Sequence, residues 1–421
     1  MCIRDRIYTA PAEHGDIRNL TNSSGSRDSY PTWSPDGKWI AYVSDKSGDD
    51  EIYLVDQMGE EPEKKLTDSG HFKENIMWSP ESDRMLFSTE ANELYMLGID
   101  GKKPTLINRN EHRDITTYAW SPDGRYVAYD FAIRNRARDI YLYDTKEKKH
   151  HQITSHMADD TEPVFTPDGK HLLLISERYH GARILCRLSL LPEEEEPFIF
   201  EDDEVIINGE EEEDDADDEG EENGKSKKGK KGKKAKKEDV VVKIDFDGIE
   251  GRIRRVPKAA GRMMHNIHAT DKYYYYLVVG KVRMMFRRSY DLYAYNIEKM
   301  KADKVASTIV AYGMSADKKK IAVFDGSNFE IFKVGGKKST AKKPTTAAAA
   351  KAKTGKLDIK RKVIMDLDRE AEWRQIFNEG WRLVKYHFYD PNYHGVDWDE
   401  VHDYYEALLP HVRTRTELNW L

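Results

Sequence analysis

The amino-acid sequence predicts a mainly β protein, a six- or seven-bladed β-propeller followed by a short α-helical C-terminal segment. Three observations predict this fold class. A turn motif recurs every 42 to 46 residues apart from one interval of 103, short β-rich segments flank each copy, and a helical period of apolar residues begins after Asp366. Repeats of about 40 to 45 residues with four short strands each are typical of propeller blades.

Each copy of the turn motif has the form Ser/Thr-Pro-Asp-Gly or a close variant, and follows an aromatic residue that ends a strand. Proline pre-sets the backbone φ of the turn, and Asp and Gly tolerate its remaining conformations. The four clear copies start at Ser34, Ser79, Ser121 and Thr166. Two weaker copies have their anchors at Ala269 and Ser315.

The segments between the turns predict the other strands of each blade. A β-rich strand such as 39–43 follows the turn, then an Ile-Tyr-Leu-like strand such as 52–54, then a strand ending in Leu-Thr or Ile-Thr. One blade cannot bury both of its faces, so the blades must stack in a ring. A β-sandwich with evenly spaced turns is the alternative, but sandwiches rarely repeat a turn tetrapeptide at a constant period. We therefore expect the propeller over residues 21–365, with a partial blade or junction at 1–20.

Two low-complexity segments interrupt the repeats. Residues 193–239 hold 21 Asp and Glu and 9 Lys, a net charge of −12, whereas the whole chain has −8, so the remainder carries −8 + 12 = +4. Such charge blocks cannot bury enough apolar surface to fold, and we predict a disordered insert there and a low-complexity insert at 335–356. The acidic run would repel phosphate and no aromatic residues interleave the lysines, so we expect no nucleic-acid partner.

The segment 366–421 has a different, helical pattern. Its first apolar residues fall at i, i+3 and i+4 spacing; they are Trp373, Ile376, Phe377, Trp381, Val384 and Phe388. Asp390-Pro391 marks a turn, Asp397 with Glu400 predicts a second helix cap, and Thr414 with Glu417 predicts a third. Because the third helix has barely begun at Leu421, we expect a truncated helical start of a further domain.

The sequence contains no recognised catalytic or ligand-binding motif. No apolar run approaches the ~20 residues of a membrane helix, and the N-terminus has no apolar signal-peptide region. Cys2 and Cys186 alone make neither a disulfide framework nor a cysteine zinc site. The nearest approach to a nucleophile motif, Gly313 to Asp317, is a blade turn. Phosphate-binding loops, zinc-protease motifs and dinucleotide fingerprints are also missing. We therefore predict no catalytic, no cofactor-binding and no metal-binding residues.

The histidines and two aspartates are the remaining candidates. We expect His150 and His151 to be solvated residues of a hairpin turn. Four further histidines, His387, His394, His402 and His411, surround the C-terminal helices, but their spacing does not place three ligands together, and we expect no metal. Asp390 and Asp397 are interpreted as turn and cap residues rather than as general acids or bases.

The C-terminal stretch resembles the helical segment that opens the catalytic half of tricorn proteases. The residues that carry the resemblance are Trp381, Phe388-Tyr389-Asp390-Pro391, His394-Gly395-Val396-Asp397-Trp398 and Leu409-Pro410. Residues 18–45 and 240–253 also resemble the propeller of that family. The likeness covers nearly the whole chain outside the two inserts, whereas the opening MCIRDR does not match and reads as a foreign prefix.

Tricorn proteases are large serine peptidases related to C-terminal processing peptidases, and their propellers are thought to filter access to the catalytic chamber. The resemblance implies that this chain is the second propeller with the start of the first catalytic segment. The family's catalytic histidine and serine and its basic substrate anchors would lie outside the chain, so the chain alone should be inactive. The implied partners are peptides or unfolded polypeptide, with a homo-oligomeric parent and no membrane.

Two other families of propeller share parts of this pattern. A non-enzymatic TolB-like propeller for protein–protein interaction is one alternative, although the C-terminal helices argue against it. The propeller of a prolyl-oligopeptidase-like enzyme is another, although these helices do not begin an α/β-hydrolase domain. For the location we expect the cytoplasm, with a periplasmic or exported protein as the alternative.

Overall fold

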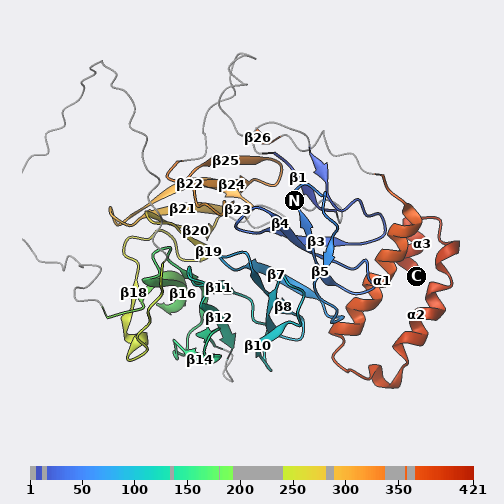
Figure 1. Ribbon diagram of the computed structural model, residues 1–421, viewed down its shortest axis with the longest axis horizontal. Helices are drawn as coiled ribbons and strands as arrows, with labels where there is room; N and C mark the ends of the chain where they lie inside the picture. Colours follow the sequence, from blue (N-terminus) through green and yellow to red (C-terminus); the bar gives the residue numbers. More distant parts are fainter. Residues whose placement is uncertain are drawn as a thin grey trace, which may run out of the picture.

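The computed structural model describes residues 6–11, 17–132, 137–179, 181–192, 240–280, 289–336, 356–357 and 366–421. These residues form six four-stranded antiparallel sheets arranged as propeller blades, a separate two-stranded sheet, and a C-terminal helical segment (Figure 1). The predicted fold class is confirmed. The insert 193–239 and most of the insert 335–356 lie outside the described residues.

Every blade is built from strands that are consecutive in sequence, and each strand pairs with the next one. The first blade contains β3 (Asp28–Trp33), β4 (Trp39–Ser44), β5 (Glu51–Asp56) and β6 (Lys64–Lys65). The second contains β7 (Lys73–Trp78), β8 (Arg84–Thr89), β9 (Glu93–Gly98) and β10 (Thr105–Arg109). The third contains β11 (Tyr118–Trp120), β12 (Tyr126–Ala132), β13 (Arg138–Asp144) and β14 (Lys149–Gln152).

The remaining three blades follow the same order, although the large insert interrupts the fourth. That blade contains β15 (Asp160–Phe165), β16 (His171–Tyr179), β17 (Ala182–Ser189) and, after the short 3-10 helix η1 (Ile249–Arg252), β18 (Ile253–Arg255). The fifth contains β19 (Met264–Ala269), β20 (Tyr273–Val279), β21 (Tyr290–Asn296) and β22 (Lys301–Ile309). The sixth contains β23 (Ala311–Met314), β24 (Lys320–Phe324), β25 (Phe329–Lys333) and β26 (Lys356–Leu357).

The hydrophobic core lies between neighbouring blades. In the first blade, Ala41 and Val43 are buried in one cluster with Trp78 and Met85 of the second blade. Successive side chains of a strand point to opposite faces of its sheet, so the middle strands of a blade sandwiched between two others are apolar on both faces. This explains why these strands read as continuous apolar runs.

The turn motif closes each first hairpin with a hydroxyl group. In the third blade, Ser121 Oγ donates to Asp123 Oδ1 at 2.6 Å and accepts the Tyr126 amide at 2.8 Å. In the fifth blade the hydroxyl belongs to Thr270, whose Oγ1 accepts the Tyr273 amide at 3.0 Å, while Ala269 ends β19. The predicted anchor Ala269 was therefore wrong by one residue. The turn there is shorter and lacks Pro-Asp-Gly, which removed the signal that fixes the position.

We expect Ser121→Ala to destabilise the chain more than Ser315→Ala, because the two serines make the same turn at different depths. Ser121 is buried, whereas the bonds of Ser315 to Asp317 and Lys320 are exposed to solvent. Loss of the buried Ser121 hydroxyl, which makes two hydrogen bonds, should lower the free energy of unfolding by about 1 to 3 kcal/mol. Loss of the two exposed hydrogen bonds of Ser315 should lower it by less than about 1 kcal/mol. Urea unfolding of both variants measures the difference, and equal midpoints would contradict this reading.

Adjacent blades are joined near the ring axis by side chains that bond to the preceding first strand. The indole nitrogen of Trp78 donates to the Thr32 carbonyl at 3.2 Å, and that of Trp120 donates to the Met77 carbonyl at 3.4 Å. The tryptophan before the turn motif of the second and of the third blade thus has a physical role: it bonds to the preceding blade.

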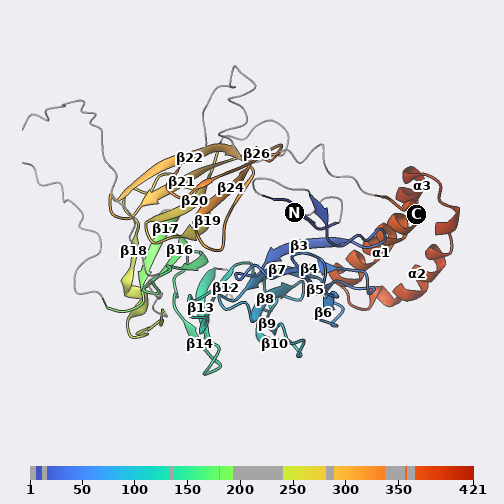
Figure 2. The ribbon, with the colours of Figure 1, turned by 45° about the horizontal axis from the view of Figure 1, so that its top comes forward.

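The strands β1 (Tyr8–Thr9) and β2 (Arg18–Asn19) form the separate two-stranded sheet. Figures 1 and 2 place these N-terminal strands between the first and the sixth blades. In the apolar cluster that they share with the first blade, Ile7 is packed with Ile40, Tyr42 and Tyr53. The described part of residues 1–20 thus forms a two-stranded sheet beside the six four-stranded blades.

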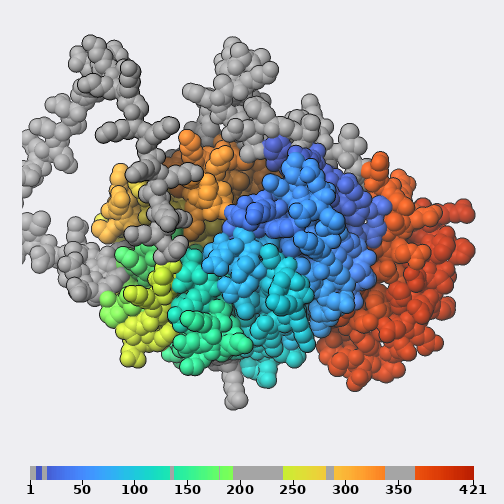
Figure 3. Space-filling model, in the orientation of Figure 1, coloured from blue at the N-terminus to red at the C-terminus, as the bar shows by residue number. Residues whose placement is uncertain are grey.

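Three α-helices make up the C-terminal segment, which lies to one side of the first blade (Figures 2 and 3). They are α1 (Arg369–His387), α2 (Trp398–Glu406) and α3 (Arg415–Trp420), with the 3-10 turns η3 (Tyr393–Gly395) and η4 (Leu409–His411) between them. Asp397 caps α2 through the amides of Asp399 and Glu400, and Thr414 caps α3 in a complete capping box with Glu417. The predicted helices and caps are confirmed.

Candidate functional site at the charged end of the propeller

Buried charged side chains gather at one end of the propeller, which we call the charged end. Here each first strand begins and each second strand ends, opposite the Ser-Pro-Asp-Gly turns. Three of the first strands begin with a fully buried charged residue, namely Asp28, Lys73 and Asp160. A buried charge requires a partner and hydrogen bonds, because the ionic form otherwise loses its hydration without compensation.

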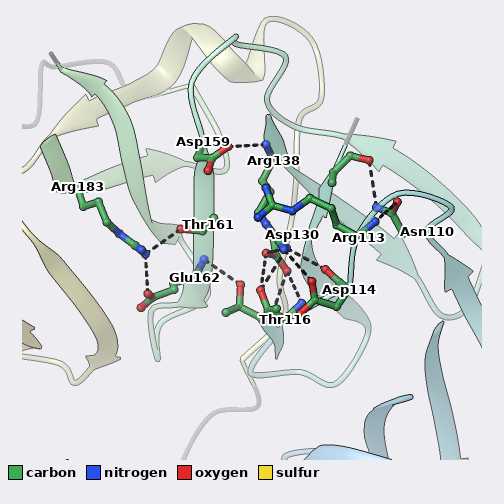
Figure 4. Close-up of polar contacts among 12 residues, drawn as sticks. Asn110, Arg113, Asp114, Thr116, Asp130, Arg138, Asp159, Thr161, Glu162 and Arg183 are labelled. Atoms are coloured by element: carbon green, nitrogen blue, oxygen red, sulfur yellow. Dashed lines mark hydrogen bonds and ion pairs between the residues drawn. The ribbon is translucent and has the colours of Figure 1, made fainter. Parts of the chain in front are cut away.

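Between the third and fourth blades the pair is Arg138 and Asp130 (Figure 4). The Arg138 guanidinium donates to Asp130 Oδ2 at 2.5 Å and to the Asp114 carbonyl at 3.0 Å, and both charged side chains are buried. The second carboxylate oxygen of Asp130 accepts the amides of Thr116 and Thr117 at 3.1 and 2.8 Å. The network therefore ties β12, β13 and the chain entering β11 together.

Glu162 occupies a bulge of β15 close to this network. Its backbone is left-handed, with φ 55°, and its carboxylate bonds to Arg183 Nη2 at 3.0 Å and accepts the amide of Asn266 from the fifth blade. Its own amide donates to Thr117 Oγ1 at 3.0 Å. Burial raises the pKa of Glu162, while the Asn266 amide and Arg183 oppose that rise. One residue thus connects three blades.

Between the first and second blades the pair is Lys73 and Glu51. Their charged atoms lie 2.9 Å apart, and both side chains are almost inaccessible to solvent. Lys73 Nζ also donates to the carbonyls of Asp50 and His71 at 2.5 and 2.8 Å. Burial lowers the pKa of Lys73, while the charge of Glu51 opposes that shift.

The helix α1 docks on the charged end at the loop between β4 and β5. Arg382 donates to Asp45 Oδ2 and to the Gly48 carbonyl, each at 2.5 Å, and its side chain is 4% exposed. Gln375 Nε2 donates to the same Asp45 oxygen at 3.1 Å. Farther along the helix, the Tyr386 hydroxyl donates to Asp49 Oδ1 at 2.9 Å. The C-terminal segment is thus held to the propeller by a largely buried polar contact.

Both sides of this contact are shaped for close approach. Gln375, Glu379, Arg382 and Tyr386 lie at spacings of 4, 3 and 4 residues, which places them on one face of α1. At Gly25, an added Cβ would lie 3.1 Å from the Cβ of Ala371, so a larger residue would push the helix away.

The apolar stripe of α1 that the sequence revealed faces the other helices instead. The indole of Trp381 donates to the Trp398 carbonyl at 3.0 Å, and the indole of Trp398 donates back at 3.2 Å. The docking face of α1 is polar, so the helical period of apolar residues did not reveal it.

We expect Asp50→Asn to stabilise the chain at pH 7 and to have little such effect at pH 4. Burial raises the pKa of Asp50 to about 6, although Arg382 opposes that rise. The folded state then holds this proton more tightly than the unfolded state, so the stability that Asp50 contributes is present at low pH and is lost as pH rises to about 6. The gain at pH 7 should be about 1 to 3 kcal/mol.

Urea unfolding from pH 4 to 8 measures this prediction, with the exposed Asp68→Asn variant as the control. Asp50→Asn should remove part of the fall in stability between pH 4 and 6. An unchanged pH profile would contradict the assignment of this fall to Asp50.

The remaining sequence candidates lie elsewhere. His150 and His151 belong to strand β14, not to the hairpin turn, which ends at Lys148, so their predicted place in the turn was wrong, although His150 is exposed as expected. His150 Nδ1 bonds to the Tyr129 hydroxyl at 2.8 Å, and His151 stacks on Phe246. The four-residue turn between β13 and β14 and the residues that follow it are too uniformly polar to locate the start of the strand.

The four C-terminal histidines do not come together. In the described part of the chain, the one group of residues with metal-ligand spacing is His402, Asp403 and Glu406 on α2. Its atoms are engaged elsewhere, since His402 Nε2 bonds to Asn378 and Glu406 pairs with Arg374.

The two aspartates act as expected. Asp390 accepts the amides of Asn392 and His394 in a turn, and Asp397 caps α2.

Cys186 is the cysteine that the structure describes, and it is buried. Burial raises the pKa of the Cys186 thiol to about 12, which suits an inert core residue. Cys2 lies outside the described residues.

Comparison with known families now gives the arrangement a context. A family model described as the tricorn protease second beta propeller domain matches residues 1–335, and one described as the tricorn protease C1 domain matches residues 369–421. The expectation that residues 1–6 fall outside the family was therefore wrong. The chain belongs to the tricorn protease family. The docking contact at Arg382 is therefore the contact between the propeller and the C1 segment of a tricorn-family chain.

The relatives and a solved structure agree with this assignment. The chain is 25% identical to a putative tricorn-like protease C-terminal subunit of Sulfurisphaera tokodaii and 22% identical to tricorn protease homolog 1 of Streptomyces coelicolor, over 99% of its own length in both cases. It spans 45% and 39% of those relatives. A crystal structure of the tricorn protease superposes with a TM-score of 0.74 at 15% identity, over 99% of this chain and 38% of that one.

Proposed function

We propose that this chain is the gating propeller and scaffold of a tricorn-type serine peptidase, and that it does not hydrolyse peptides by itself. Its ligands in this proposal are peptides or unfolded polypeptide that pass along the ring axis toward the peptidase centre of a homo-oligomeric, cytoplasmic enzyme. Among the described residues, no helix has the length and the apolar character that a membrane crossing requires.

The contact between Arg382 and Asp45 carries the proposal. It fixes the C1 segment to the charged end of the propeller, so that the two matched family segments meet at a defined place. In both ribbon views the helices lie beside the first blade and not over the centre of the ring (Figures 1 and 2). A scaffold that attaches a catalytic segment at one side, and not over the centre of the ring, suits a gate.

The first strands of the blades supply the surface that a passing peptide would meet. On β3 and β7, which lie side by side, Tyr30 and Met77 are 43% and 37% exposed, and Glu74 and Asn75 are also exposed. The bulges of β3 and β7 turn Tyr30 and Asn75 into left-handed backbone. Bulges are common where a strand redirects side chains next to a functional surface.

Photo-crosslinking tests whether a peptide follows this route. A benzophenone amino acid at Glu74, on an innermost strand, should label a fluorescent unfolded peptide, whereas the same group at Lys102, in a turn between the outer strands β9 and β10, should not. Equal labelling at both positions would refute a route past the first strands.

The same samples are assayed for hydrolysis of the peptide. We expect no cleavage above a blank. Hydrolysis that a serine-directed inhibitor blocks would show that the chain is active alone and would overturn that part of the proposal.

A further inference from the structure

The turn that joins α1 to α2 connects a tyrosine, a histidine and an aspartate by hydrogen bonds (Figure 1). The Tyr389 hydroxyl lies 2.5 Å from His394 Nε2, and His394 Nδ1 lies 3.1 Å from Asp390 Oδ2. A hydroxyl beside an imidazole that is oriented by a carboxylate is the arrangement that activates a nucleophile in many enzymes. The turn therefore contains the parts of a nucleophilic site.

The aspartate fixes the tautomer of the histidine. An ionised carboxylate only accepts hydrogen bonds, so the ring proton of His394 is on Nδ1 and points to Asp390. The lone pair of Nε2 then faces the Tyr389 hydroxyl, which donates to it. Asp390 is itself fixed, because its two oxygens also accept the amides of Asn392 and His394 at 3.0 and 2.9 Å. His394 is thus placed as a general base for Tyr389, and Asp390 is its positioning residue.

The backbone of the turn is strained where it presents the histidine. Tyr393 and His394 are both left-handed, with φ 49° and 54°, a conformation that residues other than glycine rarely adopt. Such outliers persist where the surroundings hold them, and they are common at functional sites. Here Tyr393 holds the turn, since its hydroxyl donates to the Lys385 carbonyl at 2.7 Å and its ring stacks on Trp398. Tyr389, in contrast, is 79% exposed and open to a reactant.

The surroundings of Tyr389 favour a neutral reactant and a single transfer. Residues 388–400 contain four acidic side chains and no lysine or arginine, so they repel an anionic donor. Every backbone amide from Asn392 to Val396 is bonded within the turn. These amides therefore do not serve as the oxyanion donors that repeated turnover requires.

We propose that Tyr389 is an acylation site that reacts with neutral activated esters. The phenol oxygen of Tyr389 forms a bond to the carbonyl carbon of the ester, and the bond from that carbon to the leaving oxygen breaks. His394 Nε2 takes the phenol proton and releases it to the leaving group or to water. The product is an O-acyl tyrosine, formed once per chain and without an oxidant or reductant. The inference is independent of the gating function, because it involves no residue of the propeller.

Acetylation of the full chain by p-nitrophenyl acetate tests the proposal. Tyr404, which is 70% exposed on α2, is the matched reference tyrosine, since its ring packs on Tyr405 and not on a histidine. General-base catalysis typically accelerates a reaction by about 10² to 10⁴, and the base here is open to solvent. We therefore expect Tyr389 to be acetylated at least about tenfold faster than Tyr404, and the acetyl group to accumulate. Peptide mass spectrometry over time measures both rates in one sample.

Two variants assign the roles of the histidine and the aspartate. His394→Asn removes the base but keeps a residue that tolerates left-handed backbone, and the rate at Tyr389 should fall to that at Tyr404. Asp390→Asn keeps an oxygen acceptor for the turn but places an amide donor against Nδ1, which moves the ring proton to Nε2. The rate at Tyr389 should then fall at least about tenfold, although the near-ultraviolet circular dichroism stays unchanged.

Three results would overturn the proposal. The first is equal acetylation rates at Tyr389 and Tyr404 in the unchanged chain. The second is an unchanged rate at Tyr389 in the His394→Asn variant, which would show that the histidine is not the base. The third is an equal preference for Tyr389 over Tyr404 when the anionic donor acetyl phosphate replaces the ester, because the acidic surroundings would then not select a neutral reactant.

Discussion

Replacing Arg382 with alanine should release α1 from the propeller at a cost of about 3 to 5 kcal/mol of docking free energy, the typical effect of removing one partner of a buried ion pair. The guanidinium is the common partner of Asp45 and the Gly48 carbonyl, and it lies 4.0 Å from Asp50. Without it, two buried carboxylates lose their cation. Amide hydrogen exchange of α1 and of the loop between β4 and β5 should accelerate together.

Arg374→Ala is the matched control for this prediction. It removes another arginine from the same helix. Arg374 forms its ion pair with Glu406 at the surface, where 56% of the Arg374 side chain is exposed. Exposed ion pairs contribute about 1 kcal/mol or less, so exchange at the docking loop should hardly change. If both variants accelerate exchange at that loop equally, or if neither does, Arg382 does not hold the two parts together.

The repeat made the propeller predictable from the sequence. A turn built on Pro, Asp and Gly has few conformations, so its recurrence at Ser34, Ser79, Ser121 and Thr166 reported real hairpins. The fifth blade shows the limit of this signal. Without the tetrapeptide, the anchor of the turn was predicted at Ala269 instead of Thr270, because both neighbouring residues fit an alternating strand pattern equally well.

The charged end was not predicted, because each of its ion pairs joins residues whose partnership depends on blade stacking. A signal was nevertheless present: Asp28, Lys73 and Asp160 each lie six residues before their turn hydroxyls at Ser34, Ser79 and Thr166. These charged residues occupy the same place in their repeats, at the start of the first strand of the blade. A charge at a place that is buried in each of these repeats indicates a buried ion pair. Its sign changes between blades, so a search for one residue type misses it.

The docking face of α1 was missed for a related reason. The hydrophobic period of the helix identified the side that packs on α2, and a stripe of Gln375, Glu379, Arg382 and Tyr386 resembles a solvated face. Only the partners on the propeller distinguish a buried polar stripe from an exposed one. Here Asp45, Gly48 and Asp49 supply them, more than 300 residues earlier in the chain.

Arg138→Met should cost about 3 kcal/mol or more in the stability of the propeller. The methionine fills a similar volume, but Asp130 keeps a buried carboxylate whose remaining donors are Thr116 and Thr117. The arginine also bonds to the Asp114 carbonyl, so its loss frees the chain entering β11 as well. Desolvation without compensation by a cation, rather than lost packing, is the expected source of the effect.

Two further variants separate this cause from a general effect of losing an arginine. Arg125→Met removes an arginine that bonds to Asp144 through two nitrogens at the opposite end of the same blade, but 37% of that side chain is exposed, so we expect about 1 kcal/mol or less. Arg138→Met combined with Asp130→Asn removes both charges and should recover part of the loss. Urea midpoints of these three variants and of Asp130→Asn decide the matter: if the double variant is as unstable as the sum of its two single changes, the buried charge is not the cause.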